Sequence, residues 1–217
     1  IDQVEKITHH LNSIQNLYIA DGHHRSAAAS KIFLNQKEQA TTNCFLAVTF
    51  DETELKILPY NRVVRDLNQL TVNEFLDQLS NTFKIDKMNG NSFFNEKYCY
   101  FIYLENTWYQ IKLREIPQNI SNIAETLDTR IVEEHILKPI LGIKNIRTDD
   151  RIDFVGGPQS IEKIVNLVDS GIMKIGIALP TTAIEELLKI SDSDQLMPPK
   201  STWFEPKLAD GLVSLKI

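Results

Sequence analysis

The sequence predicts a mixed α+β protein with a mixed or mostly antiparallel sheet. Two kinds of pattern alternate along its 217 residues. Apolar residues recur at three- and four-residue spacing in several segments, which is typical of amphipathic helices. Short apolar runs bounded by turn residues separate these segments and are typical of strands. A hydrophobic content of 42% with only 8 Gly and 8 Pro excludes a disordered or linker-rich chain.

The first seventy residues are predicted to form helices and strands around one tight turn. A strand at 17–20 leads into the turn Asp21-Gly22, and a helix follows at 24–34. Apolar stretches at 44–50 and 55–64 predict two further strands, which we expect to pair with each other. An opening helix is predicted by the spacing of Val4, Ile7, Leu11 and Ile14.

The remainder of the chain predicts alternating helices and strands. Thr71 and Glu74 have the spacing of a capping box and predict the start of a helix. Glu105-Asn106-Thr107 separates two apolar runs, at 98–104 and 108–113, and predicts a β-hairpin. The elements expected after it are a helix at 127–136, a strand at 152–155, a helix at 161–168, a strand at 173–179, a helix opened by Thr182 with Glu185, and a final strand at 212–215.

The overall charge disfavours DNA as a partner. The chain has 23 Lys and Arg against 29 Asp and Glu, which gives a net charge of −6, and its basic residues are scattered. Proteins that hold DNA through its phosphates present a basic face. A nucleic-acid-binding protein is therefore not the first expectation.

Cysteine usage and hydropathy indicate the compartment. Cys44 and Cys99 are the only cysteines, and both stand in apolar, strand-like contexts, so buried free thiols are expected. The sequence has no disulfide framework, signal peptide or long apolar run. We therefore expect a cytoplasmic protein without membrane association.

The most informative segment is the turn Asp21-Gly22-His23-His24-Arg25. A strand that feeds a glycine turn and then a helix exposes the free N–H groups and the positive end of the helix dipole, which attract anions. Gly22 allows a positive φ and a close approach to a ligand. Arg25 offers a fork of donors suited to phosphate oxygens. The turn therefore predicts a phosphate site, with His23 and His24 as groups that titrate near neutral pH.

Asp21 brings a negative charge into this site and admits two interpretations. In the first, Asp21 carries Mg²⁺ together with the phosphates or takes a proton from a hydroxyl. Asp21 is then the candidate metal ligand, and Asp21, His23 and His24 are the candidate catalytic residues. In the second, Asp21 only caps the helix and pairs with Arg25. Zinc is disfavoured, because no cysteine or third histidine stands at ligand spacing from the two histidines.

A second candidate phosphate contact lies near the end of the chain. The segment 200–202 follows two prolines, which fix the backbone there. A lysine and two hydroxyls held rigidly would complete a phosphate site. The alternative is a structural crossover in which Trp203 and Phe204 pack on the core. The candidate cofactor-binding residues are thus Gly22, Arg25, Lys200, Ser201 and Thr202.

Three separated motifs stand out in the sequence. They are Tyr18-Ile19-Ala20-Asp21-Gly22-His23-His24-Arg25, Leu58-Pro59-Tyr60-Asn61-Arg62-Val63-Val64 and Met197-Pro198-Pro199-Lys200-Ser201-Thr202-Trp203-Phe204-Glu205-Pro206-Lys207-Leu208. Together they resemble a prokaryotic family of proteins of unknown function, domain-of-unknown-function family 1015. Asn61 stands where that family has a histidine, which leaves no histidine for a role at this position. Family members are longer, so the resemblance implies that an N-terminal half of the full-length chain is missing here and would be its partner.

The Asp-Gly-His-His-Arg turn is also similar to one in the ParB/sulfiredoxin-like superfamily. This resemblance implies that residues 1–70 form a ParB-like phosphate-binding segment, with its N-terminal part missing. It implies that residues 71–217 form an α+β remainder that packs on this segment and returns through 197–208. Members of the superfamily bind nucleotide phosphates at such a turn and include chromosome-partition proteins, sulfiredoxin and free-serine kinases. ATP or ADP with Mg²⁺ are the cofactors that the resemblance implies.

Three functions remain open at this point. The first is a nucleotide-dependent phosphotransferase, kinase-like, acting on a small hydroxyl metabolite such as a free amino acid. The second is a ParB-like DNA-partition or regulatory module, which predicts a basic face and a helix-turn-helix that the sequence does not display. The third is a phosphatase acting on a phospho-metabolite at the same turn. The sequence leaves the oligomeric state open.

Overall fold

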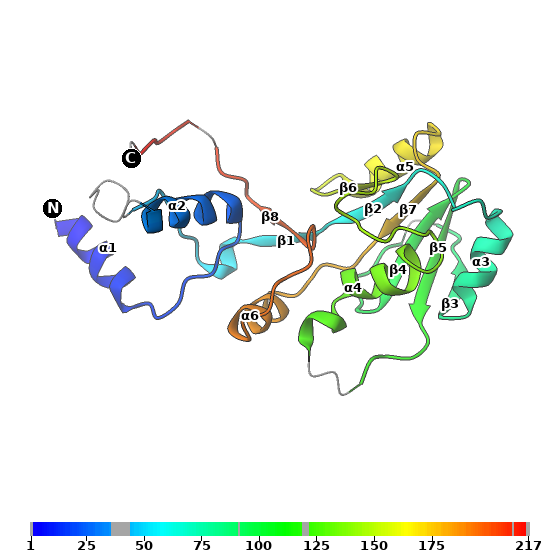
Figure 1. Cartoon of the computed structure of the whole chain (residues 1–217), viewed down its shortest axis with the longest axis horizontal. Helices are drawn as coiled ribbons and strands as arrows, with labels where there is room; N and C mark the ends of the chain where they lie inside the picture. Colours follow the sequence, from blue (N-terminus) through cyan, green and yellow to red (C-terminus); the bar gives the residue numbers. More distant parts are fainter. Residues whose placement is uncertain (1, 36–43, 91, 119–121, 210, 216–217) are drawn as a thin grey trace. The chain divides into compact units, whose positions relative to one another are not determined.

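The computed structural model of the protein describes residues 2–35, 44–90, 92–118, 122–209 and 211–215. The chain divides into two compact units. The first unit consists of Ile1–Glu54 together with Pro206–Ile217, and the second consists of Leu55–Glu205. Figure 1 shows the helices and strands of both.

The first unit contains the two predicted N-terminal helices. They are α1 (Asp2–Ser13) and α2 (His23–Asn35). A short 3-10 turn, η2 (Glu52–Glu54), ends the N-terminal segment of this unit. Neither α1 nor α2 has a buried residue. Both helices were correctly predicted, but their apolar side chains are not buried in a core within the described part of this unit.

The strands predicted for the first unit are wrong. Residues 17–20, 44–50 and 212–215 are all described, and none of them forms a strand. Their large apolar side chains are mostly exposed. A strand persists only where its backbone groups pair with a neighbouring strand, and these runs have no such neighbour among the described residues. The strand of the expected ParB-like strand-turn-helix core is therefore not formed, while its turn and helix are present.

The second unit is built on a six-stranded sheet. All of its neighbouring strands are antiparallel, in the order β3-β5-β4-β7-β2-β6, and a separate antiparallel pair joins β1 to β8. The predicted mixed α+β class with a mostly antiparallel sheet is thus confirmed. The strands are β1 (Lys56–Pro59), β2 (Asn61–Val64), β3 (Phe83–Lys87), β4 (Cys99–Leu104), β5 (Thr107–Leu113), β6 (Ile152–Val155), β7 (Ile175–Ala178) and β8 (Thr202–Glu205).

The predicted hairpin is formed by β4 and β5. Glu105 and Asn106 connect the strands with φ angles of 47° and 56°. Two successive residues with positive φ match the type I′ turn, whose twist suits antiparallel neighbours. The predicted strands at 152–155 and 173–179 are also confirmed, as β6 and β7.

Residues 55–70 lie in the second unit. The apolar stretch predicted at 55–64 does not pair with residues 44–50. It divides into β1, which pairs with β8, and β2, which is hydrogen-bonded between β6 and β7. Because β2 is an interior strand, its four residues are all buried.

Helices cover both faces of this sheet (Figure 1). All six side chains of β4 are buried and alternate between the two faces. One face packs on α3 and α4 through residues such as Phe75 and Ile131, and the other packs on α5 through Ile164. The helical elements of the second unit are α3 (Val72–Ser80), η3 (Ile123–Thr126), α4 (Asp128–Val132), the π-helical turn η4 (Glu133–Leu137), α5 (Ser160–Asp169) and α6 (Ile184–Asp192).

The capping predictions have different outcomes. At α3 the capping box is present, with the Glu74 carboxylate accepting the Thr71 N–H at 2.8 Å and the Thr71 hydroxyl accepting the Glu74 N–H at 3.3 Å. At α6 the prediction of Thr182 with Glu185 is wrong. Ala183 has an extended backbone and precedes the helix, and the Glu186 carboxylate accepts its N–H at 3.4 Å. Thr182 is buried one residue too early to cap.

The two cysteines differ in exposure. Cys99 is buried on β4 as predicted, whereas Cys44 is exposed because the strand expected around it is not formed. Within the described residues, no helix has the length and apolar content needed to cross a membrane.

Candidate functional site

The turn Asp21–Arg25 begins α2 in the first unit. Gly22 has a φ of 85°, in the left-handed region that favours glycine. Its N–H donates to Asp21 Oδ1 at 2.7 Å, and its carbonyl accepts the Ser26 N–H at 3.0 Å. This is the first backbone bond of the helix, so the N–H groups of residues 23–25 lie before it. They are the donors that a helix start leaves for a ligand.

The Arg25 side chain folds back over this helix start. A Cβ atom added at Gly22 would lie 3.7 Å from Arg25 Nε and 3.8 Å from Nη2. Arg25 is exposed and has no carboxylate partner within the part of the chain that the structure describes. The guanidinium therefore stands beside the first turn of α2.

Asp21 pairs with a residue that the sequence did not single out. The Lys207 amine donates to Asp21 Oδ2 at 2.8 Å, and both side chains are about half exposed. This hydrogen bond is the main cause that holds the pKa of Asp21 below its ordinary value, aided by the Gly22 N–H and by the charge of Arg25. The alternative in which Asp21 pairs with Arg25 is wrong, since Lys207 takes that place. Lys207 belongs to the third motif, 197–208, and this was the only available signal.

His23 and His24 occupy the first turn of α2 and are exposed. Nowhere in the described residues do three or more His, Cys, Asp or Glu side chains gather so as to hold a metal ion. Mg²⁺ commonly binds through one or two carboxylates together with phosphate oxygens and water. Asp21 is the one carboxylate of this turn, and its two oxygens accept the Gly22 N–H and the Lys207 amine.

The segment 200–202 belongs to the second unit. Lys200 is exposed, and its Nζ lies 5.2 Å from the centre of the Tyr60 ring. Ser201 is buried, its hydroxyl donates to Pro198 O at 2.7 Å and lies 3.3 Å from the Thr129 hydroxyl. Thr202 opens β8 opposite Pro59. Of the three, Lys200 has its polar group most open to solvent.

The second motif contributes a buried arginine, Arg62. Arg62 is only 1% exposed, donates to Tyr60 O and stacks over Phe154 at 5.4 Å. Burial lowers the pKa of its guanidinium to about 10, partly offset by the charge of Glu133. Asn61, which stands in place of the expected histidine, accepts the Leu179 N–H at 3.0 Å. Both residues therefore serve the interior of the second unit.

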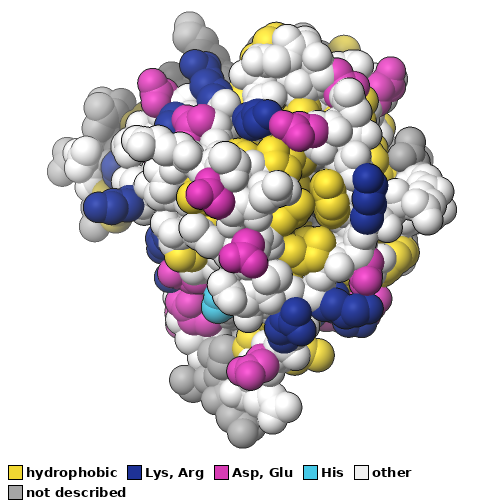
Figure 2. Space-filling model, turned by 90° about the vertical axis from the view of Figure 1, so that its right-hand side faces the viewer, with side chains coloured by type: hydrophobic (Ala, Val, Ile, Leu, Met, Phe, Trp, Pro, Cys, Tyr) yellow, Lys and Arg dark blue, Asp and Glu magenta, His cyan; other side chains and the backbone are white. Residues whose placement is uncertain are grey.

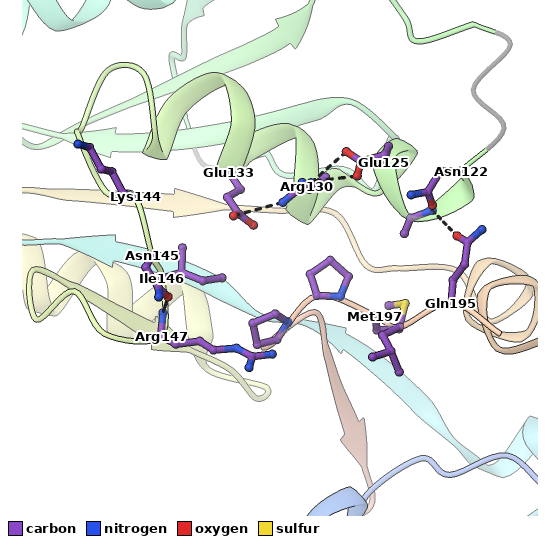
Figure 3. Close-up of a pocket in the computed structure, with 14 residues that line it drawn as sticks. Asn122, Glu125, Arg130, Glu133, Lys144, Asn145, Ile146, Arg147, Gln195 and Met197 are labelled. Carbon is purple, nitrogen blue, oxygen red and sulfur yellow. Dashed lines mark hydrogen bonds and ion pairs between the residues drawn. The ribbon is translucent and has the colours of Figure 1, made fainter. Parts of the chain in front are cut away.

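A cavity of about 500 Å³ opens elsewhere in the second unit (Figure 3). Its walls come from three separate stretches, at 122–133, 144–147 and 195–199. Arg130 lies on one wall, where it bonds to Glu125 at 3.0 Å and to Glu133 at 3.3 Å. The cavity could not be predicted from residue patterns, because its residues are far apart in sequence and share no motif.

The chain is similar to one family of proteins and to several solved structures. Residues 1–130 match a family described as "Protein of unknown function (DUF1015)". No curated protein matches the chain. Among solved structures, a free serine kinase in complex with AMP is 12% identical, with 86% of this chain and 66% of that chain covered and a TM-score of 0.47.

Two further structures are similar to the same extent. A conserved hypothetical protein from Pyrococcus furiosus is 15% identical over 86% of this chain and 68% of that one, with a TM-score of 0.45. A mutant free serine kinase in complex with ADP is 13% identical over 86% and 66%, with a TM-score of 0.42. This chain thus spans about two thirds of the length of the structures it matches. Similarity this distant does not transfer an activity.

Proposed function

The chain belongs to the DUF1015 family of proteins of unknown function, and we propose that it binds the phosphate groups of a nucleotide at the Asp21–Arg25 turn. One observation carries this proposal. The Arg25 guanidinium lies against Gly22, beside the N–H groups that precede the first backbone bond of α2. Both kinds of donor belong to one exposed helix start, and both are groups that bind oxyanions.

Each residue of the turn has its own role in the proposed phosphate site. The N–H groups of residues 23–25 and the Arg25 guanidinium donate to phosphate oxygens. Gly22 contributes its positive φ and its lack of a side chain, since its own N–H is directed to Asp21. Lys200, Ser201 and Thr202 belong to the second unit and are candidates for a separate phosphate contact of their own. Ser201 would act there as an acceptor, because its hydrogen is donated to Pro198 O.

We further propose that the phosphate is transferred to a small hydroxyl metabolite, with a free amino acid such as serine as the first candidate. In that step a bond forms between the hydroxyl oxygen and phosphorus while the bond from phosphorus to the leaving oxygen breaks. Phosphoryl transfer depends mostly on positioning and charge neutralisation. Asp21, kept ionised by Lys207, would accept the hydroxyl proton or hold Mg²⁺, which when bound neutralises phosphate charge. His23 and His24 are within the same turn and are the other candidates for proton transfer.

A DNA-binding module and a phosphatase have less support. On the face shown in Figure 2, Lys and Arg side chains are interspersed with Asp and Glu and form no continuous basic surface. The net charge of −6 points the same way. A phosphatase would use the same turn, so the choice between it and a phosphotransferase rests on the ligands that bind.

A thermal-shift panel tests the proposed site. The protein is measured with ATP, ADP, phosphoserine and duplex DNA, each with and without Mg²⁺. A ligand present at 100 times its Kd should stabilise the fold by about 2.7 kcal/mol. We expect ATP or ADP to raise the midpoint, and we expect Arg25→Ala to abolish that shift. Lys31→Ala removes the same charge from an exposed position on the same helix and should leave the shift intact.

The panel also distinguishes the three functions. A shift with DNA alone favours the regulatory module, and a shift with phosphoserine alone favours the phosphatase. If Arg25→Ala binds ATP or ADP as tightly as the parent, the turn is not the site. Phosphorus NMR of a mixture with ATP, Mg²⁺ and serine then checks transfer, since a phosphoserine signal must appear if the reaction is the one proposed.

A further inference from the structure

A cavity lies between the stretches 122–133, 144–147 and 195–199 (Figure 3). Most of the polar groups in its walls that have no hydrogen-bond partner among the described residues are donors. All of its walls belong to the second unit, whereas the Asp21–Arg25 turn belongs to the first. Its volume of about 500 Å³ falls within the range of small-molecule sites. What it can bind depends on which polar groups of its walls already have partners.

The acidic side chains of the cavity are already ion-paired. Glu125 accepts from Arg130 Nε at 3.0 Å. Glu133 accepts from Arg130 at 3.3 Å and from Lys138 at 3.0 Å. Arg130 also pairs with Glu134 at 2.9 Å. Three carboxylates thus share the charges of Arg130 and Lys138, which leaves one negative charge in excess on this wall. A ligand anion would therefore be held from the opposite wall.

The amide side chains present donors. Asn122 Oδ1 and Gln195 Oε1 both accept the Ala124 N–H, at 3.1 Å and 3.3 Å. On the opposite wall, Asn145 Oδ1 accepts the Arg147 N–H at 2.9 Å. Each of these three amides thus uses its oxygen on the backbone. Its NH₂ group has no acceptor among the residues that the structure covers, and such groups seek one when a ligand displaces water.

Arg147 adds a second cationic side chain to the opposite wall. Its guanidinium makes no ion pair or side-chain hydrogen bond within the described residues, and Figure 3 shows it extending from its loop toward the wall that carries Met197. Lys144, from the same loop, turns its amine away from the cavity in that view. A planar guanidinium is suited to two oxygens of one carboxylate or phosphate.

The remaining wall is apolar. It consists of Ile146 on one side and Met197, Pro198 and Pro199 on the other. An inorganic ion would leave this surface in contact with water, whereas an organic ligand would cover it. The ligand that matches the whole cavity therefore joins an oxyanion to an apolar body.

We propose that this cavity binds a small organic oxyanion, with Arg147 holding a carboxylate or phosphate group and the apolar wall covering the carbon skeleton. The amide donors of Asn122, Asn145 and Gln195 supply the remaining hydrogen bonds. This site is separate from the Asp21–Arg25 turn, and the proposal does not depend on the function proposed for the turn.

Titration with two defined probes tests the proposal. Succinate carries carboxylates and glycerol 3-phosphate carries a phosphate, so the pair distinguishes the two sources of the oxyanion. Both are titrated by NMR at low salt in an Arg25→Ala background, in which the turn lacks its guanidinium. We expect saturable binding of at least one probe and a shift of the Arg147 Nε–H signal. Arg147→Ala should weaken that binding about tenfold or more, as expected for a lost charge-assisted hydrogen bond.

Arg65→Ala is the matched control. Arg65 is an exposed arginine of the second unit that does not line the cavity, and its removal changes net charge by the same amount. It should leave probe binding unchanged. The proposal is overturned if neither probe binds saturably, if Arg147→Ala binds as tightly as its parent, or if the two arginine variants weaken binding equally.

Discussion

The Lys207 amine donates a hydrogen bond to the Asp21 carboxylate at 2.8 Å across 186 positions of sequence. Within the first unit, this contact ties the segment after β8 to the turn that begins α2. It keeps the proposed phosphate site electrically balanced, because Lys207 offsets the one negative charge that Asp21 brings to it. Two of the motifs noticed in the sequence therefore meet through this pair.

Replacing Lys207 should raise the pKa of Asp21. The Lys207 hydrogen bond is the largest cause that lowers this pKa, so Lys207→Met should shift the Asp21 carboxyl titration to higher pH. Carbon NMR of the labelled carboxyl measures it directly. Lys31→Met, a control on the exposed face of α2, should leave the titration where it is. An identical Asp21 midpoint in Lys207→Met would show that the pair does not persist in solution.

The capping box of α3 should contribute measurably to stability. The Thr71 hydroxyl accepts the Glu74 N–H, which otherwise has no helical partner. Thr71→Ala should reduce the free energy of unfolding by about 1 kcal/mol, read from urea midpoints. Asn73→Ala in the same first turn removes an exposed side chain without a described bond and should change stability by less than about 0.5 kcal/mol. Equal losses in both variants would rule out a specific role for the cap.

The sequence was most informative where local chemistry decides the structure. The capping box at Thr71 and the hairpin around Glu105-Asn106 depend on neighbouring residues only, and both were predicted correctly. The strands predicted at 17–20 and 44–50 failed for the opposite reason. An apolar run shows that a segment can be a strand, but its partner strand must come from elsewhere in the chain.

The candidate sites could likewise be predicted only where their residues are close together in sequence. The turn Asp21–Arg25 was visible because its donors are consecutive in sequence. Lys207 could not be assigned to Asp21, since no spacing rule links residues so far apart. The same holds for Arg147 and Gln195, which come to one cavity from segments that carry no common pattern. Where chemistry is assembled by tertiary structure, residue patterns alone do not reveal it.

Asp128 should make stability depend on pH in an unusual direction. Its carboxylate accepts the Tyr98 N–H at 2.7 Å and the Tyr100 hydroxyl at 2.9 Å, but burial outweighs these bonds and raises its pKa from 3.8 to about 6. The folded protein then binds this proton more tightly than the unfolded chain does. The contribution of Asp128 to stability is present at low pH and is lost as pH rises from about 4 to 6.

Asp128→Asn removes this titration while keeping an oxygen for both donors. Urea midpoints from pH 4 to 7 should show the parent losing stability relative to the variant as pH rises through this window, by an amount on the order of 2 kcal/mol. Asp169→Asn is the control, because the exposed Asp169 also accepts a tyrosine hydroxyl, from Tyr103 at 2.9 Å. A difference between parent and Asp128→Asn that stays constant with pH would contradict the raised pKa.

Gly176 allows α5 to pack closely on the sheet. A Cβ atom at this position would lie 2.1 Å from Cγ2 of Ile164, closer than real atoms approach. Gly176→Ala should therefore cost about 1–3 kcal/mol of stability through overpacking. Gly171, with a φ of 74° and open space around it, separates the two effects of a lost glycine. Gly171→Ala should cost only the backbone strain, about 1 kcal/mol.

A double-mutant cycle identifies the atom responsible. Ile164→Leu removes Cγ2, the atom that a new Cβ would meet, while keeping the side chain apolar and similar in volume. If the clash is the cause, Gly176→Ala should cost less in the Ile164→Leu background than in the parent, with a coupling energy of about 0.5 kcal/mol or more. Denaturant unfolding of the four proteins measures it. Strictly additive losses would mean that α5 moves away as a whole and that the contact between these two residues does not set the spacing.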